Sequence, residues 1–196
     1  MIRNIVFDLG NVLISFKPEV YLKKNYPEDK ADIILRDIFH SREWPMLDQG
    51  IIVVDEAIDL IDKKSSLERA EIASVFNLRS EIMFPLEENT KMLYRLKKEG
   101  LRLYYLSNFH LDIFVEFKKK YPFFGNFDGG VISAEVKYTK PDPEIYMILI
   151  NKYNLNPPEC LFIDDTEINV KTAESLGMKG FYTNGSEKLN LYEVVC

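Results

Sequence analysis

Short apolar runs alternate with longer amphipathic segments along most of this chain. Continuous apolar runs of this length are typical of strands that are buried on both faces of a parallel sheet. The runs lie at residues 5–7, 101–106, 130–133, 160–163 and 181–183. Apolar residues recur at helical spacing in the segments between them. This alternation predicts an α/β fold with a doubly wound, mostly parallel sheet and right-handed crossovers.

Two of the intervening segments carry clear helix boundaries. Residues 86–99 place apolar side chains on one face and are followed by Gly100, a residue typical of helix C-termini. Asp142 is a favourable N-cap and Pro143 a favourable first helical residue. We therefore expect one helix to fill residues 86–99 and another to begin at Pro143.

The segment from residue 16 to residue 84 has a different character. Charged and apolar residues mix there at helical spacing, as in residues 32–39, and Pro85 marks the return to the main domain. We therefore expect a small helical insert at 16–84. The main domain would then consist of residues 1–15 and 85–196.

Composition limits the classes of partner. The chain has 196 residues, 46% hydrophobic and 29% charged, which is enough for one core and a smaller appendage. Its net charge of −6 argues against a nucleic-acid or anionic membrane partner, because both select basic surfaces. No apolar run is long enough to span a bilayer, and no signal-peptide pattern precedes the first strand. Cys160 and Cys196 lack the spacing of a metal site or disulfide framework. We expect a cytoplasmic protein.

Polar residues suited to chemistry follow four of the predicted strands. They are Asp8, Ser107, Asn108, Lys140, Asp164 and Asp165. Because the carboxyl ends of parallel strands meet at one edge, where open α/β sheets bind ligands, we expect these side chains to converge.

This set of residue types suits phosphoryl transfer. Carboxylates on two strand ends can hold Mg²⁺, which keeps water and substrate oxygens as its other ligands. The cation and Lys140 would neutralise a phosphoryl group, while Ser107 and the Asn108 backbone N–H would hydrogen-bond its oxygens. Asp8 would then attack phosphorus and form an aspartyl-phosphate intermediate, a known form of covalent catalysis.

Four ordered motifs resemble those of the haloacid dehalogenase (HAD) superfamily. They lie at residues 7–13, 106–108, 140–141 and 162–165 and extend from one end of the chain to the other. Within the superfamily the chain resembles small-cap members such as α-D-glucose-1-phosphate phosphatase and the phosphatase domain of soluble epoxide hydrolase. The resemblance implies a phosphoric monoester hydrolase with a Rossmann-like core and a small helical cap inserted after the first strand. The predicted insert has that position.

The resemblance also implies a metal site. Asp8 resembles the nucleophile and a Mg²⁺ ligand, and the carbonyl of Gly10 resembles another ligand. Asp165 resembles the ligand from the second strand. Asp164 resembles a nearer or second-shell partner of the metal.

The remaining motif residues resemble a phosphate-binding group. They are Ser107, Asn108 and Lys140, and Lys140 also has a catalytic role in the charge stabilisation described above. The implied substrate is a small phosphorylated metabolite. We expect a sugar phosphate such as glucose 1-phosphate.

Gly10 departs from the pattern of most phosphatases in the superfamily, in which an Asp at this position acts as general acid and base. General acid catalysis is typically worth about 10²–10⁴-fold, so its loss weakens the hydrolysis of esters with poor leaving groups. A sugar 1-phosphate leaves more easily, because its anomeric oxygen is more acidic. The same glycine occurs in the glucose-1-phosphatase likeness.

Two alternatives stay open at this stage. A 2-haloacid dehalogenase shares the implied fold and nucleophile but needs no metal, and the Asp164 and Asp165 pair disfavours it. Gly10 also permits a catalytically weak or inactive protein that binds phosphorylated ligands or protein partners.

The positions of three further residues also stay open. His110 either approaches the site or lies on a surface helix. Trp44 and Asp48 either face the substrate or belong to the insert's own core.

Overall fold

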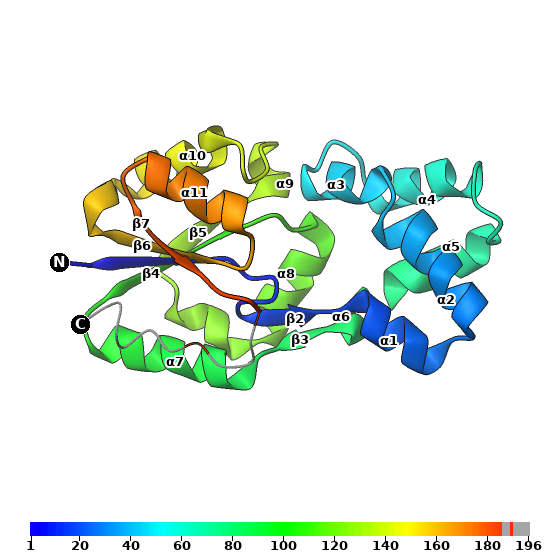
Figure 1. Ribbon diagram of the computed structural model, residues 1–196, viewed down its shortest axis with the longest axis horizontal. Coiled ribbons are helices and arrows are strands. Elements are labelled where there is room, and N and C mark those ends of the chain that lie inside the picture. The colour runs from blue at the N-terminus through cyan, green and yellow to red at the C-terminus, as the bar shows by residue number, and fades with distance from the viewer. Residues whose placement is uncertain (186–188, 190–196) are drawn as a thin grey trace.

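The computed structural model describes residues 1–185 and residue 189, and a five-stranded parallel sheet lies at its centre (Figure 1). The strand order is β5-β4-β1-β6-β7. The strands are β1 (Asn4–Phe7), β4 (Arg102–Ser107), β5 (Gly129–Ile132), β6 (Cys160–Asp164) and β7 (Lys179–Tyr182). Every pairing is parallel. The predicted α/β fold with a doubly wound parallel sheet is confirmed.

Two helical layers cover the sheet (Figure 1). Helices α10 (Pro143–Tyr153) and α11 (Glu167–Ser175) lie on one face, and α7 (Glu87–Lys98) and α8 (Leu111–Lys120) lie on the other. Side chains of β1 alternate between the layers, as the two-residue period of a strand requires. Ile5 and Phe7 join the cluster that contains α7 and α8, and Val6 joins the cluster that contains α10 and α11. Burial on both faces explains why this strand is a continuous apolar run.

Short elements complete the core. They are α9 (Ser133–Val136) and the single turns η2 (Pro122–Asn126) and η3 (Pro157–Glu159). Asp142 caps α10 as expected, since its side chain accepts a hydrogen bond of 2.9 Å from the Glu144 backbone N–H.

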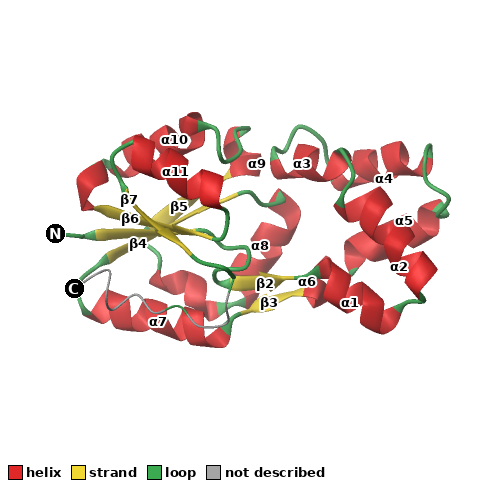
Figure 2. Cartoon of the chain, in the orientation of Figure 1, coloured by secondary structure: helices red, strands yellow, loops and turns green. Residues whose placement is uncertain are grey.

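A separate group of helices lies beyond the carboxyl ends of the strands (Figure 2). It contains α1 (Pro18–Asn25), α2 (Glu28–Ile34), η1 (Leu35–Phe39), α3 (Glu43–Asp48), α4 (Val54–Asp62), α5 (Arg69–Asn77) and α6 (Arg79–Ile82). These helices share a hydrophobic cluster of their own. The segment therefore has the helical character that its amphipathic spacing predicts.

An antiparallel pair of short strands joins the two parts of the molecule, and sequence reasoning did not predict it. Strand β2 (Ile14–Phe16) pairs with β3 (Met83–Pro85). Each strand has three residues, too few to establish a two-residue period in the sequence. Within residues 1–185, no helix is long and apolar enough to cross a membrane.

The helical cluster should contribute measurably to stability. Ile61 of α4 is fully buried in that cluster, whereas its neighbour Leu60 is 37% exposed. We expect Ile61→Ala to lower the free energy of unfolding by about 2–5 kcal/mol, because it removes buried methyl groups and leaves a cavity. Leu60→Ala is the matched control and should lose less than half as much. Denaturant titration monitored by circular dichroism measures both, and equal losses would contradict the assignment of a buried cluster.

Candidate active site

The carboxylates predicted to converge do lie together at the carboxyl edge of the sheet. Asp8 directly follows β1, and Asp164 and Asp165 lie at the end of the adjacent strand β6. One carboxylate oxygen from each of the three residues lies within 4.8 Å of the other two. The parallel pairing of β1 and β6 is what brings residues more than 150 positions apart to the same point.

Lys140 lies between two of these carboxylates. Its Nζ atom is 2.9 Å from Asp8 Oδ1 and 2.5 Å from Asp164 Oδ2. Only 5% of the residue is exposed, so the ammonium depends on these partners for its charge. Burial alone would lower the pKa of Lys140, but Asp8 and Asp164 outweigh burial and raise that pKa above its ordinary value. The ammonium therefore stays protonated at neutral pH.

Asn108 fixes the position of Lys140. Its Oδ1 accepts a hydrogen bond of 2.8 Å from the Lys140 backbone N–H, and its Nδ2 donates one of 3.0 Å to the Lys140 carbonyl. The side chain that the sequence placed in the phosphate-binding group is thus engaged in holding the Lys140 loop. Ser107, the last residue of β4, is buried beside it at the same sheet edge.

Asp164 is fully buried and already accepts several hydrogen bonds. Thr166 donates its backbone N–H to Oδ1 at 2.8 Å, and Asn169 Nδ2 donates to the same oxygen at 3.0 Å. The Lys140 ammonium occupies Oδ2. Asp164 therefore holds Lys140 in place and has little capacity left for a further ligand.

Asp165 is half-buried and more available than Asp164. Burial raises the pKa of its carboxyl group, a hydrogen bond from Asn11 opposes this, and the charge of Asp164 adds to the rise. An exposed oxygen ligand next to a buried, satisfied one is an arrangement that a cation at the sheet edge can use.

Asp8 has an unusual electrostatic environment. Its Oδ1 accepts the Leu9 backbone N–H at 2.7 Å and pairs with Lys140. Burial and the charge of Asp164 raise the pKa of Asp8 to about 7, against the opposing effect of Lys140. Three carboxylates face one ammonium here, so the cluster has an excess of negative charge. A hard divalent cation fits both this charge and these oxygen donors.

Gly10 is not required by packing or by backbone conformation. Its φ angle lies outside the left-handed region that favours glycine. A Cβ atom built at this position would meet only Asp8 Oδ2, at 4.0 Å, which is an ordinary contact. The site therefore has room for a Cβ atom at position 10.

His110 is buried at the boundary between the core and the helical insert, not exposed on a surface helix. It immediately precedes α8 and is 3% exposed. Arg79 Nη1 lies 3.0 Å from His110 Nδ1, and Arg79 Nη2 lies 2.5 Å from Asp112 Oδ2. Asp48 Oδ1 lies 3.4 Å from His110 Nε2. Sequence reasoning missed Arg79, because nothing in the local pattern distinguishes it from a solvated helix residue.

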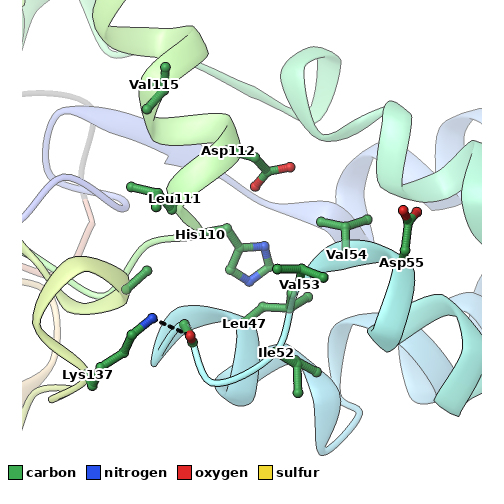
Figure 3. Close-up of a pocket in the computed structure, with 12 residues that line it drawn as sticks. Leu47, Ile52, Val53, Val54, Asp55, His110, Leu111, Asp112, Val115 and Lys137 are labelled. Carbon is green, nitrogen blue, oxygen red and sulfur yellow. Dashed lines mark hydrogen bonds between the residues drawn. The ribbon is translucent and has the colours of Figure 1, made fainter.

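Two cavities adjoin His110. The smaller, of about 130 Å³, is lined by residues that include Gly10, Asp48 and Asn108. The larger, of about 530 Å³, is mostly apolar and lies between the insert and α8 (Figure 3). Its apolar lining consists of Leu47, Ile52, Val53, Val54, Leu111, Val115 and Ala134.

Trp44 contributes to the insert's own packing and also approaches the site. Its ring lies 5.6 Å from Phe16 and 4.8 Å from Phe39, between ring centroids. The same ring is 4.5 Å from His110 and lines the smaller cavity. Trp44 therefore belongs to the insert's own core and also lines this cavity.

Comparisons with known proteins agree with this geometry. The chain is 27% identical over 181 residues to a sesquiterpene phosphatase of Aspergillus oryzae, covering 92% of this chain and 89% of the relative. It is 27% identical over 201 residues to a D-ribitol-5-phosphate phosphatase of Bacteroides thetaiotaomicron, covering 95% of each. A solved structure of a HAD family enzyme from that bacterium, in complex with magnesium and inorganic phosphate, superimposes with a TM-score of 0.78 at 24% identity and covers 99% of both chains.

The family model for haloacid dehalogenase-like hydrolases matches residues 2–177, which contain every strand end described above except that of β7. The match includes the helical insert as well as the carboxylate cluster. The chain belongs to the haloacid dehalogenase-like hydrolases, and its phosphatase relatives identify it as a phosphoric monoester hydrolase.

Proposed function

We propose that this hydrolase is a Mg²⁺-dependent phosphatase that cleaves a small phosphorylated metabolite through an aspartyl-phosphate intermediate on Asp8. One observation carries the proposal. A buried ammonium from Lys140 contacts Asp8 directly, inside a cluster of three carboxylates whose charge it only partly neutralises. Such a cluster suits the binding of a metal ion together with a phosphoryl group.

The metal ligands would come from two adjacent strand ends. The proposed ligands are Asp8, the Gly10 carbonyl and Asp165. Asp164 would not bind the metal directly and would instead hold Lys140 in place. Bound Mg²⁺ would neutralise charge on the phosphoryl oxygens and so make the phosphorus easier to attack. A magnesium complex in a relative's solved structure supports this choice of ion.

The chain's own residues would carry out both steps. Asp8 attacks phosphorus, forming an oxygen–phosphorus bond as the bond to the leaving oxygen breaks. Lys140 stabilises the developing negative charge, with Ser107 and the Asn108 backbone N–H on the other phosphoryl oxygens. Water then attacks the aspartyl phosphate and restores the Asp8 carboxylate.

Residues 16–84 would act as the cap of this active site. The insert lies beyond the strand ends, and Asp48 reaches the cavity that Gly10 lines. A cap in this position can exclude water while the phosphoenzyme exists. The core would then be residues 1–15 and 85–196, with the β2–β3 pair at the junction.

The substrate class has two candidates. A sugar 1-phosphate such as glucose 1-phosphate suits the easier leaving group that Gly10 favours. The name of one relative, D-ribitol-5-phosphate phosphatase, supports small phosphorylated carbohydrates as a class, but its ester oxygen belongs to a primary alcohol. The apolar cavity beside His110 favours a substrate with a hydrocarbon chain, as does the name of the sesquiterpene phosphatase relative. Its volume of about 530 Å³ is within the usual range for small-molecule sites.

Removal of the nucleophile should abolish turnover. We expect Asp8→Asn to lower the rate of phosphate release from p-nitrophenyl phosphate by at least about 10³-fold, because an amide cannot act as the nucleophile. EDTA should lower the wild-type rate similarly. Asp59→Asn, on the surface of α4, is the control and should leave the rate unchanged. Turnover that survives both EDTA and Asp8→Asn would refute the mechanism, and halide release from 2-haloacids in EDTA would support a dehalogenase instead.

Metal binding should depend on pH. Since the pKa of metal-free Asp8 is about 7, Mg²⁺ must displace a proton from it below that pH. We expect the Mg²⁺ affinity to fall by up to about tenfold per pH unit below about pH 7 and to level off above it. Calorimetric titration at several pH values measures this slope. An affinity that is the same at about pH 6 and about pH 8 would contradict the proposed role of Asp8 as a ligand.

A substrate panel should separate the two classes. If the larger cavity holds a hydrocarbon chain, we expect kcat/KM to be at least about tenfold higher for a prenyl monophosphate than for glucose 1-phosphate. If the substrate is a sugar phosphate, we expect the reverse order. Val115→Asp, which places a charge in the larger cavity, should lower turnover only of the prenyl substrate. Ligand binding without any phosphate release would favour the non-catalytic alternative.

A further inference from the structure

The proposed reaction lacks a proton donor for the leaving oxygen. Gly10 has no side chain, and Lys140 is held by two carboxylates that favour its charged form. The structure brings a carboxyl group of the insert to a cavity that adjoins the site at Gly10 and Asn108. Asp48, the last residue of α3, lines the cavity of about 130 Å³ together with Gly10 and Asn108.

Contacts with the core hold this part of the insert in place. The Ser133 hydroxyl donates a hydrogen bond to the Asp48 carbonyl. Gln49 Nε2 donates to the Lys137 carbonyl at 2.9 Å, and Lys137 Nζ donates to the Gly50 carbonyl. Three consecutive residues at the end of α3 are therefore fixed to α9 and the residue that follows it. The backbone at Asp48 is therefore fixed relative to the core, although it belongs to the insert.

His110 orients the Asp48 side chain. An arginine can only donate hydrogen bonds, so Arg79, at 3.0 Å, requires Nδ1 of His110 to be the acceptor. The proton of the neutral ring is then on Nε2, which lies 3.4 Å from Asp48 Oδ1. Arg79 is itself held by Asp112. A chain of charged and polar groups therefore runs from α8 through Arg79 and His110 to Asp48.

The Nε2 atom has no other assigned role. It is buried, and its neighbours within the described residues are Asp48 and the Trp44 backbone, which hydrogen-bonds the ring. Figure 3 shows the ring extending from the start of α8 toward the insert residues Leu47 and Val53. A buried N–H group is costly to leave unsatisfied, and Asp48 Oδ1, 3.4 Å from Nε2, offers it an acceptor.

We propose that Asp48 is the general acid and base of this phosphatase and takes the role that Gly10 cannot fill. The inference rests on the proposed phosphatase function. In the first step, Asp48 donates its proton to the leaving oxygen as the phosphorus–oxygen bond breaks and Asp8 becomes phosphorylated. In the second step, the Asp48 carboxylate accepts a proton from the water that attacks phosphorus. Asp8 leaves as a carboxylate, and Asp48 is protonated again.

The protonation states agree with this assignment. Burial raises the pKa of Asp48 above its ordinary value, which favours the protonated form that a general acid needs. Burial and the neighbouring Arg79 lower the pKa of His110 to about 3. His110 therefore stays neutral and acts as a positioning residue, while Asp48 is the group that contacts the substrate.

Leaving-group dependence tests the proposal. Asp48→Asn keeps an oxygen that can accept the His110 N–H but cannot transfer a proton. The leaving group of p-nitrophenyl phosphate needs no proton. With this substrate we expect Asp48→Asn to release a first burst of p-nitrophenolate as fast as the wild type does. Its steady-state turnover should then be slow, because no base activates the water in the second step. With a phosphate ester of a primary alcohol, such as a sugar 6-phosphate or a prenyl phosphate, we expect the single-turnover rate to fall by about 10²–10⁴-fold. Asp59→Asn serves as the control and should match the wild type with both substrates.

A second variant makes the test independent of folding defects. The Cβ position at Gly10 is open, so we expect Gly10→Asp to supply a carboxyl group when it is added to Asp48→Asn. With the poor leaving group, the double variant should react at least about tenfold faster than Asp48→Asn alone. Equal losses for both leaving groups without rescue would show a structural role and overturn the proposal. An unchanged rate with the poor leaving group would overturn it as well. A wild-type protein that releases no phosphate from any substrate would instead refute the underlying phosphatase function.

Discussion

The contact of the Lys140 ammonium with Asp8 and Asp164 is the interaction on which the rest of the site depends. Asp8, Lys140 and Asp164 come from three separate parts of the chain, and the parallel sheet places them at one edge. Two buried carboxylates without this ammonium would repel each other and take up protons. With it, Asp164 is fully satisfied by fixed donors, whereas Asp8 keeps an unusually high pKa. The fold thereby provides one structural carboxylate and one reactive carboxylate side by side.

In the proposed mechanism, the core and the insert each supply residues to the active site. The core supplies Asp8 and Lys140, and the insert supplies Asp48, which contacts the core through His110. If the acid and base belongs to the insert, proton transfer requires the insert to be docked on the core. Chemistry and closure are then linked, because an open enzyme would hold the nucleophile without its proton donor. Such an arrangement limits wasteful reaction of the phosphoenzyme before the pocket is closed.

Much of the fold followed from the sequence, because strands buried on both faces must be continuous apolar runs. Asp8 and the pair at Asp164 and Asp165 could be located since each lies at the end of such a run. The β2–β3 pair could not, because three-residue strands have no readable period. The network of Arg79, His110 and Asp48 depends on packing between the insert and the core, and no local spacing encodes it. The second role of Asn108, as a clamp on the Lys140 backbone, likewise appears only when the two loops are seen together.

The covalent intermediate is the central claim, and it can be observed directly. The enzyme would be mixed with p-nitrophenyl phosphate and Mg²⁺, quenched in acid within milliseconds, and digested for peptide mass spectrometry. The account predicts a phosphoryl group on the peptide that contains Asp8, present in the wild type and absent from Asp8→Asn. Turnover with no phosphorylated peptide at any quench time, or phosphorylation of another residue, would contradict it.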